Sequence, residues 1–122
     1  MKKLLFILLF PALFACTPQG IQTIEGEWTI TEYYQNNNDE THHTVNSNVI
    51  DFDPSESITL CNQKSYMLHQ DGGWMGNMNT YRIVGDLIYN GCDAWYQIEW
   101  ISNNKVKLIS VVHTGRHLIL ER

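Results

Sequence analysis

The sequence predicts an all-β protein, a small closed antiparallel up-and-down β-barrel of about eight strands. Short runs in which apolar and polar residues alternate recur about every ten residues, with glycine, asparagine or aspartate between them. No stretch shows a helical period of useful length. In so short a chain, closing the strands into a barrel removes the exposed edges that an open sheet would leave.

The N-terminus has the layout of a bacterial export signal. Lys2 and Lys3 precede an apolar run over residues 4–13, and Ala15 places a small residue at the expected cleavage site. The apolar run is too short to span a membrane. Cys16 follows the cleavage site directly and resembles the lipobox cysteine of bacterial lipoproteins, which is acylated, for instance with palmitate. The alternative is an ordinary signal peptide followed by a chance cysteine.

We therefore expect three segments: a signal peptide at residues 1–15, a lipidated tether at residues 16–23 and a barrel domain at residues 24–122. Thr17 stands where an aspartate is associated with retention in the inner membrane. The lipoprotein resemblance therefore implies an anchor in the outer membrane, with the periplasmic face favoured over the cell surface.

The charge of the chain argues against nucleic acid as a partner. The chain has 8 basic and 13 acidic side chains; removing residues 1–15 takes away two lysines, which leaves 6 against 13, or −7. A domain this acidic repels phosphate backbones and anionic lipid headgroups. Attachment to a membrane would therefore come from the lipid on Cys16.

The strand at residues 24–34 is the one around which the barrel is organised. Its apolar residues and its glycine alternate with polar residues, so Ile24, Gly26, Trp28 and Ile30 face the same side. Trp28 is then an anchor of the core. Gly26 would let another backbone or ring approach it closely.

The segment after this strand is polar. Residues 35–48 contain almost no apolar side chains and predict a long exposed loop. A short strand at residues 49–52 follows, and the Asp-Pro dipeptide at residues 53–54 should end it.

The next hairpin carries one of the two remaining cysteines. Residues 57–61 and 65–69 form its strands, joined by residues 62–64. An exported chain with two cysteines beside strand ends predicts a disulfide between Cys61 and Cys92, worth about 3–4 kcal/mol in the chain-entropy model. The alternative is a pair of free buried thiols.

Trp74 and Met75 lie between glycines in the turn at residues 70–77. Large apolar groups at a loop tip suggest contact with a ligand at the barrel mouth or with another protein. The alternative is a loop that folds back as a lid over the end of the barrel. Replacing both residues with serine separates the two, because only a lid would lose much thermal stability.

Turn residues delimit the following strands. Residues 78–84 and 87–90 flank a Gly-Asp turn at residues 85–86, and residues 94–101 alternate again. One face of this last strand is formed by Ala94, Tyr96, Ile98 and Trp100.

Residues 105–112 and 117–122 form the last hairpin. A two-residue loop at residues 114–115 would gather apolar residues on one side. Arg122 would then point inward at the end of the strand. The opposed pairs would be Val111 with Leu118 and Ile109 with Leu120.

Gly26, Trp28 and Arg122, placed on the first and last strands of a meander, resemble the bacterial lipocalin-like domains of the calycin group. In that family the tryptophan closes one end of the barrel and a C-terminal arginine packs across the indole. The resemblance implies a cation–π contact, worth about 1–2 kcal/mol when desolvated. The family's Thr-Asp-Tyr motif is missing, and Thr80-Tyr81 is at best a remnant of it.

Whether the barrel holds a ligand depends on its lumen, because eight strands leave room either for their own side chains or for one small ligand. We expect a filled core in preference to an open pocket, since four large rings point inward: Trp28, Tyr81, Tyr96 and Trp100. In an open lumen Tyr81, Tyr96 and Trp100 would contact the ligand.

No pattern indicates a metal, a cofactor or catalysis. His42 and His43 lie in a polar loop, and the expected register puts His113 and His117 on opposite faces. Spacings typical of a catalytic triad, a phosphate loop or paired catalytic carboxylates are missing. Around Pro54, three carboxylates lack the further ligands of a calcium loop, namely Asp51, Asp53 and Glu56.

The sequence thus predicts a lipid-anchored, non-catalytic envelope lipoprotein whose barrel binds a small apolar molecule or serves as a binding module. The alternative is a protein-interaction module, such as an inhibitor of an extracellular hydrolase, since lipoproteins of the resembling family include protease inhibitors. Residues 35–48 or the Trp74 loop would then block the partner. An apolar void well above a few hundred cubic ångströms would favour the carrier.

Overall fold

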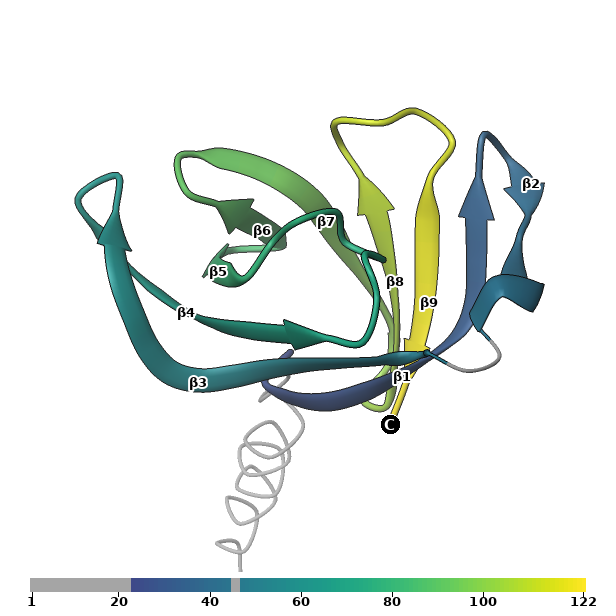
Figure 1. Cartoon of the computed structure of the whole chain (residues 1–122), viewed down its shortest axis with the longest axis horizontal. Coiled ribbons are helices and arrows are strands. Elements are labelled where there is room, and N and C mark those ends of the chain that lie inside the picture. The colour runs from purple at the N-terminus through teal and green to yellow at the C-terminus, as the bar shows by residue number, and fades with distance from the viewer. Residues whose placement is uncertain (1–22, 45–46) are drawn as a thin grey trace, which may run out of the picture.

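The computed structural model describes residues 23–44 and 47–122, which form a closed barrel (Figure 1). Each barrel strand is antiparallel to its neighbours, and β1 pairs with both β3 and β9, which closes the ring. The predicted all-β barrel of about eight strands is confirmed. Its strands are β1 (Gly26–Gln35), β3 (Val49–Leu60), β4 (Gln63–Gln70), β5 (Thr80–Val84), β6 (Leu87–Asn90), β7 (Asp93–Ser102), β8 (Lys105–Ser110) and β9 (His117–Glu121).

The expected signal peptide at residues 1–15, Cys16 and residues 17–22 of the tether lie outside the described residues. No helix in the described part of the chain is long and apolar enough to cross a membrane.

Two small elements lie beside the ring. β2 (Asn38–Asp39) pairs with the end of β1, and η1 (Thr41–Thr44) is a 3-10 helix. Asn36 and Asn37 adopt φ values of 54° and 66°, which turn the chain back onto β1. Thr44 is buried. The predicted exposure holds for residues 35–39, 42 and 43, but part of the segment forms β2 and η1 and is not an irregular loop.

The core contains the inward residues of β1 that alternation predicts. Trp28 is fully buried, and Ile24 and Ile30 are also buried. A shift in the β1–β9 register after Ile30 then turns Tyr33 inward and leaves Glu32 partly exposed. The simple period of two therefore holds only for the first half of the strand.

Gly26 is required by its backbone conformation. Its φ is 111°, which L side chains rarely adopt, and a Cβ at this position would meet nothing within 4 Å. The expectation that Gly26 allows a close approach to Trp28 is therefore wrong.

β3 is one long, strongly curved strand that runs through Pro54 (Figure 1). The β3–β4 ladder shifts register between Asp53 and Glu56 and again between Glu56 and Thr59. Such irregularities accommodate a proline, which has no N–H to donate to the ladder. The prediction of a strand that ends at Asp53 is therefore wrong. Because β3 curves, the β3–β4 hairpin bends away from the direction of the first half of β3 (Figure 1).

Of two predicted tight turns, one is displaced and one is found where it was expected. Cys61 and Asn62 both have positive φ and form the β3–β4 turn, so the expected connection at residues 62–64 is displaced. Gly85-Asp86 joins β5 to β6 as predicted. On β7, the predicted inward face is confirmed by the buried residues Tyr96 and Ile98.

The predicted register of the last hairpin is wrong by three residues. The loop spans residues 111–116, because the Ser110 hydroxyl accepts hydrogen bonds from the N–H groups of Val112 and His113. Ile109 faces His117 and lies outside the core. The inward pairs are Leu108 with Leu118 and Val106 with Leu120.

Candidate functional site

The antiparallel order places successive turns alternately at the two ends of the barrel. We call the end where β1 begins and β9 finishes the proximal end; it also carries the β5–β6 and β7–β8 turns. The β3–β4 turn is an exception, because the curved β3 brings it beside the β6–β7 turn, where Cys61 is bonded to Cys92. The distal end carries the β4–β5 loop (residues 71–79), the β6–β7 turn and the β8–β9 loop (residues 111–116).

The distal end is closed by the β4–β5 loop. Met75 is fully buried, and the Trp74 ring packs edge-on against Tyr33 with 5.1 Å between centroids. The Gln70 amide donates hydrogen bonds to the carbonyls of Gly76 and Met78, at 3.2 and 3.1 Å, and its Oε1 accepts one from the Met75 N–H. Trp74 and Met75 thus form a lid over the core, and the alternative of a free contact tip is not supported.

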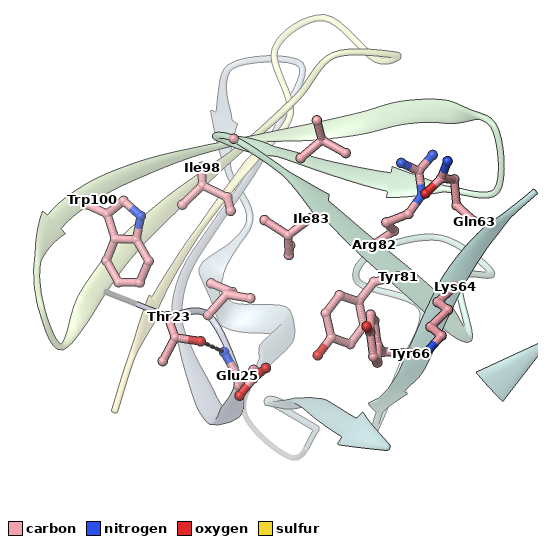
Figure 2. Close-up of a pocket in the computed structure, with 13 residues that line it drawn as sticks. Thr23, Glu25, Gln63, Lys64, Tyr66, Tyr81, Arg82, Ile83, Ile98 and Trp100 are labelled. Carbon is pink, nitrogen blue, oxygen red and sulfur yellow. Dashed lines mark hydrogen bonds between the residues drawn. The ribbon is translucent and has the colours of Figure 1, made fainter. Parts of the chain in front are cut away.

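The proximal end contains a pocket of about 590 Å³ (Figure 2). Its inner wall combines aliphatic and aromatic side chains, and polar side chains form its rim. The lining residues are Thr23, Ile24, Glu25, Gln63, Lys64, Tyr66, Tyr81, Arg82, Ile83, Val84, Gly85, Ile98 and Trp100. The lumen is therefore filled distally and open proximally, and the expectation of a filled core is wrong for the proximal half.

The pocket follows from an incomplete seam between β4 and β5. Only Tyr66 with Tyr81 and Met67 with Thr80 are paired in this ladder. Continuing the register would pair Lys64 with Ile83, yet the ladder does not extend that far. Both strands continue along their other neighbours, so the wall opens at this point and Lys64, Ile83 and Tyr66 line the gap.

A disulfide holds the hairpin that forms one side of the seam. Cys61 in the β3–β4 turn is bonded to Cys92 in the β6–β7 turn, with 5.3 Å between their Cα atoms. The predicted pairing is confirmed. The bond fixes the β3–β4 turn beside the β6–β7 turn.

Tyr81 is a neutral aromatic wall of the pocket. Its hydroxyl donates a hydrogen bond to the Asp53 carbonyl at 3.2 Å, and its ring packs edge-on against Phe52. Burial, with the nearby carboxylate of Glu25 next in importance, raises the pKa of Tyr81 well above its usual range. Tyr81 therefore offers a ligand its ring and no negative charge.

The cations at the rim already have partners. Lys64 Nζ lies 3.3 Å from the Glu56 carboxylate, and the Arg82 guanidinium stacks over Tyr89 and donates to the Gly91 carbonyl. Both side chains are therefore held by contacts within the protein. The opening therefore suits a neutral or amphipathic ligand better than a multiply charged one.

The predicted contact residues are divided among three places. Tyr81 and Trp100 line the pocket, Tyr96 is buried in the core, and Trp74 and Met75 form the lid. Sequence reasoning missed most of the rim. Ile83 could have been predicted, because it lies two residues after Tyr81 and therefore faces the same side of β5. The gap between β4 and β5 has no local sequence signal.

Sequence reasoning considered His42 and His43 as metal ligands but did not include Glu40, which lies beside them. The ligand atoms of Glu40, His42 and His43 lie within 4.8 Å of one another. His43 Nε2 is 3.1 Å from Glu40 Oε1, and His42 Nε2 is 3.9 Å from the same atom. Both histidines are exposed, and only His43 lies within hydrogen-bond distance of Glu40 Oε1.

The carboxylates around Pro54 do not converge on a common point in the part of the chain that the structure describes. Asp53 accepts a hydrogen bond from the Ser55 N–H at 2.9 Å and lies 3.1 Å from His69 Nε2. These contacts hold the pKa of Asp53 below its usual range, and hydrogen bonding to Ser55 has the largest effect. Asp53 is thus engaged in local contacts of its own.

Fold and pocket together define a small closed β-barrel with a ligand-sized opening at one end. Comparison of the chain with protein-family models, with curated proteins and with solved structures finds no match.

Proposed function

We propose that this protein is a lipid-anchored, non-catalytic lipoprotein of the cell envelope, lipocalin-like in kinship, whose barrel binds a small ligand with a substantial apolar part. The observation that carries this proposal is the proximal pocket. Its volume of about 590 Å³ lies within the range of small-molecule sites, roughly 300–1,000 Å³. Ile24, Ile98 and Trp100 supply the apolar surface that such a ligand would cover.

The composition of the pocket supports binding over catalysis. Its lining contains one carboxylate, Glu25, and neither a histidine nor a cysteine. The Tyr81 hydroxyl donates a hydrogen bond to a backbone carbonyl. A general acid and base pair would need two poised groups within reach of one substrate atom.

The lipid anchor is proposed from the sequence. The expected cleavage after Ala15 leaves Cys16 as the acylated first residue, and Thr17 favours the outer membrane and its periplasmic face. Mass spectrometry of the chain purified from envelope fractions tests this. The expected mass is that of residues 16–122 plus the acyl groups, and Cys16→Ala should abolish the addition. An unmodified Cys16 would contradict the anchor.

Ligand binding is tested with an apolar fluorophore. N-phenyl-1-naphthylamine should bind the purified protein saturably at one site, and Ile83→Glu, which places a charge in the opening, should weaken binding at least tenfold, about 1.4 kcal/mol. Val112→Glu is the matched control, because it alters a similarly exposed aliphatic residue at the distal end. Equal binding by both variants would contradict the pocket as the site.

The alternative of a hydrolase inhibitor has less support. It depends on exposed loops, and of the two segments expected to block a partner the Trp74 loop is folded over the core, while residues 35–43 are mostly exposed but partly ordered. Residues 38–44 form β2 and η1, with Thr44 buried, and Trp74 and Met75 form the lid.

A further inference from the structure

The segment after β2 is fixed against β1. β3 pairs with β1 only as far as Thr29, and β2 takes its place beside the end of β1 (Figure 1). The Tyr33 carbonyl accepts a hydrogen bond from the Glu40 N–H at 2.8 Å, and the Tyr33 N–H donates one to the Thr41 hydroxyl at 3.1 Å. The backbone at Glu40 and Thr41 is therefore held in place on the barrel wall.

The turn of η1 brings His43 over Glu40. The His43 N–H donates a hydrogen bond to the Glu40 carbonyl at 3.0 Å, and the hydroxyl of the buried Thr44 donates one to the Thr41 carbonyl at 2.8 Å. In a 3-10 helix, side chains three residues apart lie one above the other. The backbone thus places His43 on the same side as Glu40, with His42 next to it.

The ligand atoms of these three side chains have the spacing of a metal site. Zinc binds imidazole nitrogen and carboxylate oxygen at about 2.0–2.2 Å, so two of its ligands at the tetrahedral angle are about 3.3–3.6 Å apart. Glu40 Oε1 lies 3.1 Å from His43 Nε2 and 3.9 Å from His42 Nε2, one distance on each side of that range. Small rotations of the exposed side chains would bring all three ligand atoms onto one ion.

Hydrogen bonding explains the position of only one of the two histidines. His43 Nε2 is within hydrogen-bond distance of Glu40 Oε1, whereas His42 Nε2 is not. The two imidazole rings nevertheless lie together, with 4.0 Å between their centroids and 41° between their planes. Exposed imidazoles are free to turn towards water, so the approach of both rings to one carboxylate oxygen indicates a shared cation.

The charge around the three side chains favours a cation. Residues 23–44 contain five acidic side chains and neither lysine nor arginine. The ion-pair partners of Glu40 among the described residues are the two histidines. A second carboxylate lies nearby on Asp39: the hydrogen bond from the Thr41 hydroxyl lowers the pKa of Asp39 most, and His42 lowers it by a smaller amount.

We propose that Glu40, His42 and His43 form a surface site for a divalent transition-metal ion such as Zn²⁺. Neutral imidazole offers a ring nitrogen to such ions, whereas Ca²⁺ and Mg²⁺ prefer shells of six or more oxygen atoms. Three protein ligands leave a position on the ion for water or for a group of another molecule.

The site is independent of the proximal pocket and of the lipid anchor, because none of the residues that line the pocket lies between Gly26 and Asn62. The polar composition of residues 35–48 did not predict it, since an irregular loop would not hold three ligands together. The hydrogen bonds to Tyr33 and within η1 supply the order that a metal site needs.

Isothermal titration calorimetry with Zn²⁺ tests the site. The chain carries Cys16→Ala and no histidine tag, because a free thiol or a tag would itself bind zinc, and it is first treated with EDTA. Zinc should bind saturably at one ion per chain, and Ca²⁺ and Mg²⁺ should not. His42→Ala, His43→Ala and Glu40→Gln should each weaken zinc binding at least tenfold, since even groups outside the ligand shell typically contribute roughly 10–100-fold to metal affinity.

Two matched variants serve as controls. His113→Ala removes an exposed histidine from the β8–β9 loop, and His69→Ala removes one whose Nε2 lies 3.1 Å from the Asp53 carboxylate. Both should bind zinc as tightly as the chain with Cys16→Ala alone. NMR of the imidazole rings should show zinc-dependent shifts for His42 and His43 and none for His113.

The absence of saturable zinc binding would overturn the proposal. A loss of affinity in His113→Ala or His69→Ala equal to that in His43→Ala would place the ion elsewhere and overturn it as well. Zinc binding that is unchanged in His42→Ala would contradict the set of three ligands, and Ca²⁺ binding as tight as that of Zn²⁺ would contradict the class of ion.

Discussion

The Arg122 guanidinium lies over the Trp28 indole, with 4.1 Å between its central carbon and the ring centroid. It donates hydrogen bonds to the carbonyls of Glu25 and Asn103, both at 3.0 Å, and the indole N–H donates to the Ile24 carbonyl. The last residue therefore ties the start of β1 to the β7–β8 turn.

The predicted contact of Arg122 with Trp28 is confirmed, although its inward orientation needs correction. Trp28 is fully buried, whereas Arg122 is exposed as a whole. The guanidinium therefore covers the indole from the proximal end of the barrel and does not enter the lumen.

Arg122→Ala should lower the free energy of unfolding by about 1–2 kcal/mol, because it removes the cation–π contact and two charge-assisted hydrogen bonds. Urea denaturation at neutral pH measures the loss. Lys105→Ala is the control: its ammonium lies 3.7 Å from the Glu121 carboxylate in a partly exposed pair, worth less than about 1 kcal/mol. Equal losses in the two variants would argue against a special role for Arg122.

Cys61→Ser/Cys92→Ser should destabilise the protein by about 3–4 kcal/mol, because a cross-link between residues 31 apart restricts the unfolded chain. Urea denaturation with and without dithiothreitol measures this. The reductant should lower the stability of the natural chain to that of the variant and leave the variant unchanged. A response of the variant to dithiothreitol would show that the reductant acts elsewhere.

Met75→Ala should cost about 2–5 kcal/mol, the range for truncating a buried methionine, because it leaves a cavity under the lid. Thermal denaturation measures the change. Asn77→Ala, an exposed position in the same loop, should have little effect. A Met75→Ala variant as stable as Asn77→Ala would restore the interpretation of the loop as a free contact tip.

His117 should make the protein less stable in mild acid. Its ring stacks on Tyr34, with 4.4 Å between the ring centroids. Burial lowers the pKa of His117 most, and the charge of Lys107 lowers it further, while Glu32 partly opposes both effects. The unfolded chain then binds a proton more readily than the folded one, so stability is lost as pH falls through the unfolded value of about 6.5. Urea denaturation of His117→Gln should show a shallower loss between pH 7.5 and 5.5 than the natural chain, and parallel profiles would contradict this.

Much of the fold can be read from local alternation. The inward faces that contain Trp28 on β1 and Tyr96 on β7 are predicted correctly, because the strand period of two is a property of the chain itself. The Gly85-Asp86 turn is likewise predicted from a short-range signal, and the disulfide from the two cysteines that remain in an exported chain after Cys16. Predictions fail where a strand bends or a loop lengthens, as at Pro54 and after Ser110.

By itself, then, the sequence determined an all-β meander, the inward faces of β1 and β7, and the contact of Trp28 with Arg122. The tertiary structure alone decided that β3 curves through a proline, that the last hairpin has a longer loop, and that β4 and β5 separate above Tyr66. Pairing between strands depends on their curvature and on the distant Cys61–Cys92 bond, neither of which a local pattern contains. The pocket forms at that separation, so it belongs to the folded barrel and to no single stretch of the chain.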